Sequence, residues 1–168
     1  STARVLLVSR ASPTALANDG KTALHSAALR GKSDLLSLLI GKIPVNVPDA
    51  TGETPLHDAT AAAMVNTLLE HRARIEARDV YEHTPLHEAA IHGIDRVVKS
   101  LLQHRASAEV RDTAGYTPRD LALMHGYAAT AKLLPIPSAV QSYSSLAKSV
   151  RFWVAWCSCI FCPTAFIF

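Results

Sequence analysis

The sequence has no cysteine, phenylalanine or tryptophan before residue 152. All three cysteines, all four phenylalanines and both tryptophans lie between Phe152 and Phe168. Without thiolates, the part of the chain before residue 152 lacks the ligand spacing of a closed zinc site. It also has no nucleophile elbow, no phosphate-binding glycine loop and no HExxH helix. These absences favour a non-enzymatic chain that uses no metal and no other cofactor.

A strong charge of either sign is also missing. The 168 residues carry 17 lysines and arginines against 14 aspartates and glutamates, a net charge of +3. The acidic and basic residues are interspersed, so the chain lacks the basic footprint that binding to a phosphate backbone requires. The length suits one compact domain and excludes a large multidomain enzyme, and nucleic acid is not an expected partner.

What the sequence does contain is a repeat. Related segments begin at Thr22, Thr54, Thr84 and Thr117, with spacings of 32, 30 and 33 residues. The first three read TALHSAA, TPLHDAT and TPLHEAA, and the fourth reads TPRDLA. Each is followed by a second apolar stretch and a short extended loop. A unit of this size cannot close a core around itself, so neighbouring units must stack.

The local chemistry of each unit predicts helix, turn, helix and loop. Threonine is a good N-cap and proline a good first helical residue, so the first helix of a unit begins at the Thr-Pro pair. Gly31, Gly93 and Gly126 lie nine residues after their threonines, where a left-handed residue can end that helix. The expected fold class is an all-α solenoid of stacked helix-turn-helix units with β-hairpin-like loops.

These segments resemble ankyrin repeats, whose signature is T-P-L-H-x-A at a period of 33 residues. The resemblance covers residues 1–134, with a partial repeat at 1–21, repeats from Thr22, Thr54 and Thr84, and a capping repeat from Thr117. Since the chain opens with Ser1 in the middle of a unit, we expect at least half a repeat to precede it. The resemblance implies a protein-interaction scaffold in the cytoplasm.

Two units depart from the pattern. The second lacks three residues and the turn glycine, which predicts a tighter turn between its helices or a longer first helix, and the weakest interface in the stack. The fourth carries Arg119 and Asp120 where the others carry Leu-His or its equivalent. Such a polar-modified last unit predicts a C-terminal cap that faces water.

Three of the eight histidines, His25, His57 and His87, occupy the same position of the repeat. The resemblance implies a structural role for them, with hydrogen bonds to the threonine three residues earlier and across to the next repeat. We therefore expect the repeat motif itself to be structural. Its residues are Thr22, His25, Thr54, His57, Thr84, His87 and Thr117.

Partner binding in such a solenoid is expected on the concave face, which is made from the loop tips and the exposed side of the first helices. Tyrosine suits this task because it combines a large contact area with a polar end. The simpler alternative is that these are ordinary surface residues. The repeat register selects the following candidate partner-binding residues: Glu53, Asp58, Val80, Tyr81, His83, Glu88, Ile91, His92 and Tyr116.

The chain after residue 134 differs in character. Residues 135–151 form a linker with the pattern of an amphipathic helix. Residues 152–168 contain no charge and predict either a membrane segment, packing on the last repeat, or an extension without a selected function. Cys157, Cys159 and Cys162 are candidate lipidation sites. The alternative function is therefore the cytosolic ankyrin domain of a truncated or tail-anchored membrane protein, resembling those of ion channels or palmitoyltransferases, with the membrane as a partner through residues 152–168.

Overall fold

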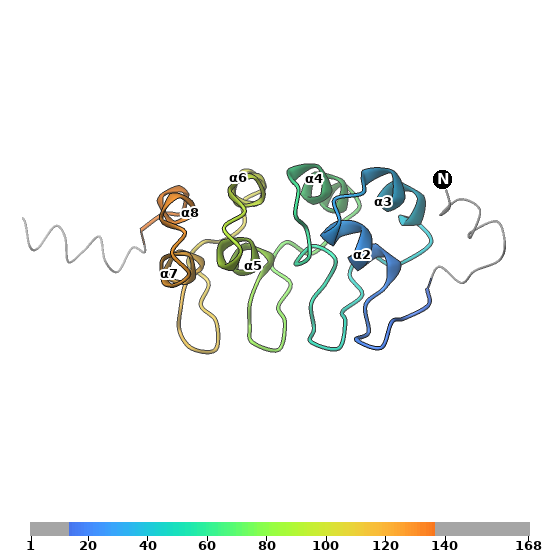
Figure 1. Ribbon diagram of the computed structural model, residues 1–168, viewed down its shortest axis with the longest axis horizontal. Helices are drawn as coiled ribbons and strands as arrows, with labels where there is room; N and C mark the ends of the chain where they lie inside the picture. The colour runs from blue at the N-terminus through green and yellow to red at the C-terminus, as the bar shows by residue number, and fades with distance from the viewer. Residues whose placement is uncertain (1–13, 137–168) are drawn as a thin grey trace, which may run out of the picture. The chain divides into compact units, whose positions relative to one another are not determined.

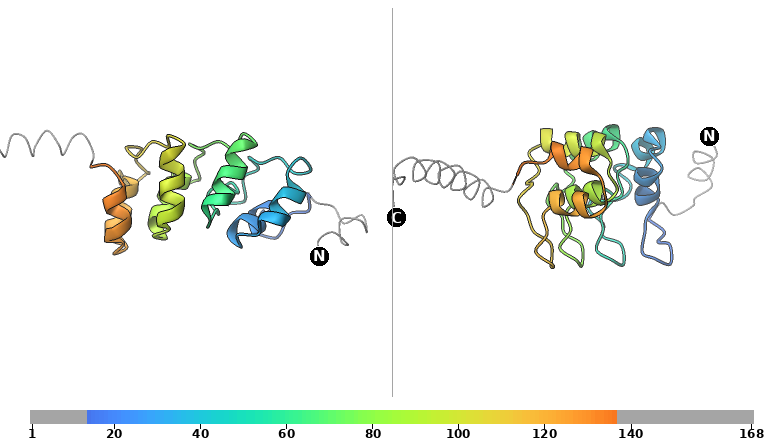
Figure 2. Two further views of the ribbon diagram at one scale, coloured as in Figure 1. Left: turned by 90° about the horizontal axis from the view of Figure 1, so that it is seen from above. Right: turned by 60° about the vertical axis from the view of Figure 1, so that its left-hand side comes forward.

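The computed structural model describes residues 14–136 as a stack of short helices in two layers (Figure 1). Figure 2 shows the connecting loops side by side along one edge of the stack. Within these residues there are seven helices and no strand, apart from one isolated bridge between Ile40 and Ile43. The helices are α2 (Ala23–Leu29), α3 (Ser33–Leu39), α4 (Ala62–Glu70), α5 (Pro85–Ile91), α6 (Asp95–Gln103), α7 (Pro118–Met124) and α8 (Ala128–Leu133). The predicted all-α stack of helices is confirmed for this part of the chain, and three of the four repeats contain a helix pair.

The first helices of the repeats begin where the threonines predict. Thr22 and Thr84 are the N-caps of α2 and α5, and each forms a capping box with the histidine three residues later. Thr117 caps α7 in the same way, with Asp120 in place of histidine. These side chains satisfy backbone groups that the first turn of a helix leaves without a partner.

One continuous core runs through the stack. Leu24, Leu56 and Leu86 occupy the same position of successive repeats and are at most 1% exposed. Val65, Val98 and other apolar residues of the second helices pack against them. Each fully buried side chain of this kind contributes about 2 kcal/mol of transfer free energy. Since the first three units bury this leucine in one shared cluster, their core is common to the stack.

The second repeat has no first helix. After Thr54 the chain makes a single turn, held by hydrogen bonds from His57 N to Thr54 O at 2.9 Å and from Ala59 N to Leu56 O at 3.4 Å. The next helix, α4, begins eight residues after Thr54, whereas α3, α6 and α8 begin eleven residues after their threonines. The prediction of a tighter turn or a longer first helix was therefore wrong.

The physical reason is the core. Helix α4 buries Met64, Val65 and Leu68, and this face must keep its register with the neighbouring second helices. The three missing residues are consequently lost from the first helix, whose last turn faces outward. Thr60 lies just before α4 and contacts the preceding repeat. Its Oγ1 donates to Ala28 O at 3.3 Å and to Leu29 O at 3.0 Å, at the C-terminal end of α2.

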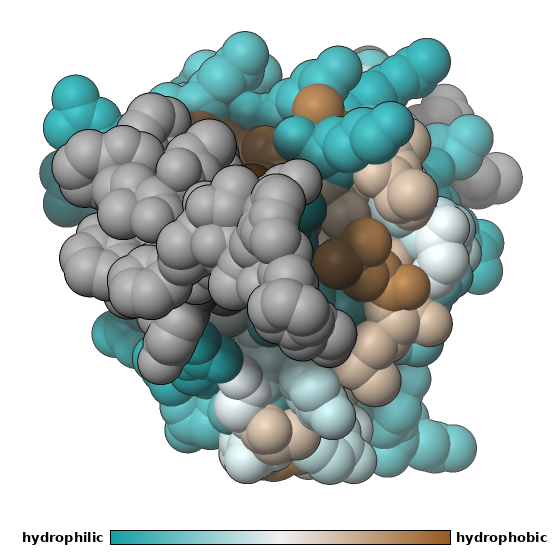
Figure 3. All heavy atoms as spheres, turned by 90° about the vertical axis from the view of Figure 1, so that its left-hand side faces the viewer, coloured by the Kyte–Doolittle hydropathy of each residue, from teal (hydrophilic) through white to brown (hydrophobic). Residues whose placement is uncertain are grey.

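The last unit ends the stack with backbone caps. Arg119 Nη1 donates to Ala131 O and, at 3.0 Å, to Leu134 O at the end of α8. The two polar substitutions therefore satisfy backbone groups and do not cover the end of the stack with charge. Leu123 and Met124 are 51% and 62% exposed, and apolar atoms lie open among hydrophilic ones where Figure 3 looks onto this end. The last described repeat thus exposes apolar side chains that the sequence did not predict, and the expectation of a water-facing cap stays a prediction.

None of the helices within residues 14–136 has both the length and the apolar character needed to cross a bilayer. Several predictions concern residues outside the described range. They are the first half of the partial repeat, nearly all of the linker 135–151, the hydrophobic segment 152–168, and lipidation of Cys157, Cys159 and Cys162.

Candidate functional site

The loops between repeats form a regular platform. Asp49, Asp79 and Asp112 each accept backbone N–H groups two and four residues later through one carboxylate oxygen, at 2.7–3.0 Å. Adjacent loops are joined by hydrogen bonds from Val80 N to Thr51 O at 3.0 Å and from Thr113 N to Tyr81 O at 3.1 Å. Residues at the loop tips are therefore held in fixed positions relative to one another.

Three apolar residues project from this platform. Val80 is 60% exposed, Tyr81 57% and Tyr116 40%. A side chain with this exposure makes no large contribution to the core, yet the backbone that carries it is fixed. Such residues can bury apolar area against a partner with little loss of conformational freedom.

The repeated histidines connect each first-helix position to the next loop. Thr22 N donates to His25 Nδ1 at 3.1 Å, so the proton lies on Nε2, which donates to Glu53 O at 3.1 Å. His57 contacts His83 O at 3.1 Å and His87 contacts Tyr116 O at 3.4 Å in the same way. Burial lowers the pKa of His57 and His87 below the ordinary value of 6.5, although the carbonyl contacts oppose this shift. The rings of His57 and His87 are therefore neutral structural links, and His25 makes the equivalent contacts in its own repeat.

Charged side chains gather on the surface formed by the first helices. Lys21 Nζ lies 3.1 Å from Glu53 Oε2, 2.9 Å from Asp58 Oδ1 and 3.6 Å from Asp49 Oδ2. Burial alone would lower the pKa of Lys21, but the hydrogen bonds and charges of Asp58 and Glu53 outweigh it and raise this pKa above its ordinary value. Lys21 is consequently a permanent cation bound by carboxylates of the following repeat.

A second group of charges surrounds His83. Its Nδ1 lies 3.1 Å from Glu88 Oε1 and 3.6 Å from Asp79 Oδ2, and its Nε2 lies 3.5 Å from Asp112 Oδ2. His92 Nε2 lies 3.6 Å from Glu88 Oε2. Burial raises the pKa of Glu88 above its ordinary value, helped by Glu53 and Asp79 and opposed by the two histidines.

Asp79, His83 and Glu88 offer ligand atoms within 4.8 Å of one another, a spacing that a metal ion could use. The sequence predicted no metal site in the repeats, because nothing beside the histidines supplies the carboxylate or thiolate spacing of a closed zinc site. However, Asp112 contacts the other ring nitrogen of His83, so the imidazole already has carboxylate partners on both sides. These contacts account for the cluster as a network of polar contacts that links two loops to α5.

The missing helical turn of the second repeat leaves a hollow of about 470 Å³ beside these charges. Of the nine predicted partner-binding residues, four line it, namely Glu53, Asp58, Glu88 and His92, while Val80, Tyr81 and Tyr116 lie on the loops. Ile91 is half-buried and does not line the hollow. The full lining consists of Lys21, Leu29, Glu53, His57, Asp58, Ala59, Thr60, Glu88, Ala89, His92 and Ile94.

The candidate partner-binding residues predicted from the sequence do not include Lys21, Leu29 and Ile94, which also line the hollow. The repeat register could have identified Lys21, because it precedes Thr22 just as Glu53 precedes Thr54 and His83 precedes Thr84. The same repeat position therefore supplies a lysine, a glutamate and a histidine to one surface. Leu29 and Ile94 gave no such signal, since they are exposed to the hollow only because a helical turn is missing between them.

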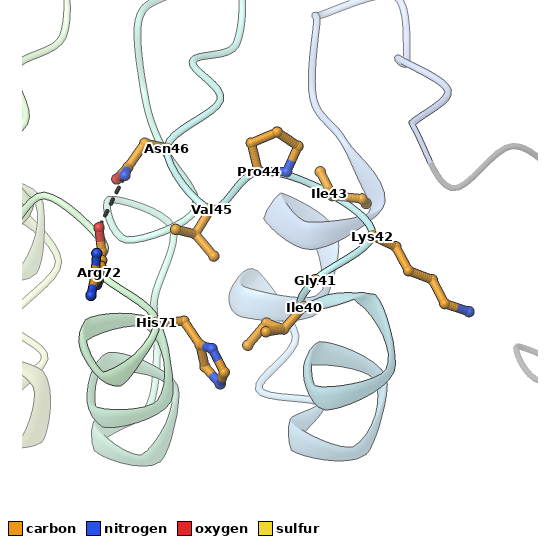
Figure 4. A pocket seen from close by; sticks show the side chains of 9 residues that line it. All are labelled: Ile40, Gly41, Lys42, Ile43, Pro44, Val45, Asn46, His71 and Arg72. Carbon is orange, nitrogen blue, oxygen red and sulfur yellow. Dashed lines mark hydrogen bonds between the residues drawn. The ribbon is translucent and has the colours of Figure 1, made fainter.

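A second hollow, of about 510 Å³, lies at the C-terminal ends of α3 and α4 (Figure 4). Asn46 forms one wall, where its Nδ2 donates to Arg72 O at 3.1 Å and its Oδ1 accepts from Arg74 N at 2.8 Å. These bonds join the loops of successive repeats. None of the predicted partner-binding residues lines this hollow, so it offers no support for a site there.

Comparison with known proteins identifies relatives over part of the chain. Tyrosine-protein kinase Shark from Drosophila melanogaster is 44% identical over 80 residues, which are 45% of this chain and 8% of that protein. Ankyrin repeat domain-containing protein 53 from Macaca fascicularis is 39% identical over 84 residues, 45% of this chain and 17% of that protein. Inversin from Danio rerio is 34% identical over 73 residues, 40% and 7% respectively. The chain thus spans less than a fifth of each of these relatives.

The family model for ankyrin repeats in three copies matches residues 1–79 and 64–136, which together cover most of the chain. This match agrees with the repeat register, the capping boxes and the stacked helix pairs described above. The chain belongs to the ankyrin-repeat family.

Proposed function

We propose that this chain is a protein-interaction module that binds a partner protein through the face formed by its loop tips and first helices. Ankyrin repeats generally mediate protein–protein interaction. The observation that carries the proposal for this chain is the exposure of Val80, Tyr81 and Tyr116 on loops that are hydrogen-bonded to each other. Binding at this face requires no cofactor and no reaction.

The choice of this face is supported by what the rest of the platform contains. The loop aspartates and the histidine links are engaged in holding the loops together, whereas Val80, Tyr81 and Tyr116 have large exposed side chains. Tyrosines are enriched among the residues that contribute most to interface affinity. We therefore assign the loop-tip tyrosines the role of anchors, and Glu53, Asp58, Glu88 and His92 the role of polar contacts on the adjoining helices.

The test is affinity capture from cells with the tagged 168-residue chain, compared with a variant that carries Tyr81→Ala and Tyr116→Ala. We expect at least a tenfold loss of each specifically captured protein, on the order of the effect of removing two interface anchors. The melting temperature should change little, because both side chains are exposed. Leu123→Ala with Met124→Ala removes comparable exposed apolar area at the end of the stack and serves as the matched control.

Unchanged capture by the tyrosine variant would contradict the proposal and direct the search to the opposite face. Equal loss in the tyrosine variant and in the Leu123/Met124 control would also contradict it, because binding would then follow exposed apolar area and not the loop platform.

A further inference from the structure

The hollow in the second repeat has two kinds of lining. Leu29, at the end of α2, is 51% exposed, and Ile94, between α5 and α6, is half-buried. Glu53, Asp58 and Glu88 supply carboxylates to the same hollow. The site therefore presents an apolar rim beside an acidic wall, and it exists only because the repeat lacks its first helix.

The charges in the hollow do not balance. Three carboxylates, those of Glu53, Asp58 and Glu88, face one ammonium, that of Lys21, which leaves two negative charges when the histidines are neutral. The whole chain has a net charge of +3, so this surface is opposite in sign to the protein that carries it. Complementarity at an interface favours a partner of the opposite charge.

The chain itself shows how a cation occupies this surface. Lys21 enters from the first repeat and places its ammonium group within 3.1 Å of both Glu53 and Asp58. One repeat further along, the position equivalent to Lys21 holds Glu53, and the position equivalent to Asp58 holds Glu88. Within residues 14–136, the basic groups in contact with Glu88 are His83 at 3.1 Å and His92 at 3.6 Å. Glu88 is half-buried and has no lysine or arginine contact among residues 14–136.

We propose that this hollow receives an arginine side chain from the partner protein. The guanidinium group would bind Glu88, with the negative charge of Asp58 nearby, while its aliphatic stem and an adjacent apolar residue would cover Leu29 and Ile94. Arginine is favoured over lysine because its planar group forms paired hydrogen bonds with carboxylates, and because its stem packs well on apolar surface. This inference rests on the proposed function, since it specifies part of the partner that the module binds.

The test uses the 168-residue chain and defined probes. Fluorescent hexapeptide mixtures are synthesised in which one central position is fixed as arginine, lysine, glutamine or glutamate and the others are varied. In fluorescence anisotropy, we expect the arginine mixture to bind about tenfold more tightly than the glutamine mixture, as for a charge-assisted pair. Binding of the glutamate mixture should be the weakest.

Variants of the chain test whether the preference for arginine peptides depends on the residues of the hollow. Asp58→Asn with Glu88→Gln should abolish the preference for arginine, whereas Asp34→Asn with Glu70→Gln removes the same charge from exposed positions on α3 and α4 and should preserve it. Leu29→Lys places a cation on the rim without altering an acidic residue and should also abolish the preference. This variant keeps the test decisive if loss of Asp58 disturbs the contact with Lys21.

The possible outcomes separate the two proposals. If the arginine and glutamine mixtures bind equally, or if the Asp34/Glu70 control loses the preference as fully as the Asp58/Glu88 variant, the arginine site is refuted. Peptide binding that is lost with Tyr81→Ala and Tyr116→Ala but is insensitive to Asp58, Glu88 and Leu29 would refute only the arginine site. Binding that none of these variants affects would contradict the proposed function as well.

Discussion

The second and third repeats begin with nearly the same residues, Thr54-Pro55-Leu56-His57 and Thr84-Pro85-Leu86-His87, yet they fold differently. The third forms α5 and α6 with Gly93 between them, and the second forms only one turn before α4. Their buried leucines and histidine links are equivalent. The comparison shows that the inner anchor of a repeat can be kept while its outer helical turn is lost.

The difference has a consequence for function. In the third repeat, the end of α5 and the following turn are occupied by His92 and Gly93. The second repeat has no residues equivalent to these. Carboxylates and apolar side chains from three successive repeats line the resulting hollow. The loss of a few residues therefore leaves the hollow that we propose as a binding surface, in a place that a regular repeat would fill.

The sharpest test of the complete repeat is the substitution Gly93→Ala. Gly93 has φ of +63°, and a Cβ there would lie 2.4 Å from Tyr127 Cδ1. We expect a loss of about 2 to 4 kcal/mol in the free energy of unfolding, from backbone strain and overpacking together. Urea unfolding followed by circular dichroism measures it.

Gly31→Ala is the matched control for this substitution. Gly31 has nearly the same φ, +62°, but its Cβ would meet only Thr60 Oγ1 at 3.7 Å. We expect a loss of about 1 to 2 kcal/mol there, from strain alone. Equal losses at the two positions would show that crowding by Tyr127 is unimportant and that the two turns do not differ.

The structural difference between the second and third repeats can be removed by completing the second repeat. Inserting Ile-His-Gly after Thr60 restores the length of the third repeat, and we expect a full first helix that fills the hollow. The free energy of unfolding should rise by about 1 kcal/mol, in the range typical of consensus changes, and the preference for arginine peptides should disappear. Urea unfolding and the anisotropy assay measure the two effects, and a more stable variant that still prefers arginine would contradict the proposed location of the site.

The smallest effect concerns two of the three buried histidines that the repeats share, His57 and His87. The pKa of His57 and His87 is lowered in the folded protein, so the unfolded chain binds protons that the folded chain resists. Their contribution to stability is complete above pH 6.5 and is lost as pH falls below it. We expect each ring to account for up to about 1 kcal/mol between pH 7 and 5.

Urea unfolding at both pH values, for the His57→Asn and His87→Asn variants, tests this expectation. Each variant should have a shallower pH dependence than the unaltered chain. His71→Asn, which removes an exposed histidine, provides the control for the loss of a histidine as such. A His71 effect as large as that of His57 would assign the pH dependence to general charge instead.

The sequence was sufficient to predict the repeat register and the start of each first helix that forms. It also predicted Glu53, Asp58, Glu88 and His92, which the structure brings to one hollow. It did not predict the missing helix, because a deletion in a repeat does not say which element shortens. It did not predict Leu29 or Ile94 either, because each looks like an ordinary helix-end residue in its own repeat.

Two levels of information are therefore separable in this protein. The sequence by itself determined the stacked helices, since N-caps, prolines and apolar periodicity act over a few neighbouring residues. Only the tertiary structure decided the charge network and the hollow, because their contacts join residues 32 and 37 positions apart, as between Lys21 and Glu53 and between Lys21 and Asp58. Such contacts depend on how whole repeats stack, and the need to keep α4 in register with its neighbours determined where the chain left space.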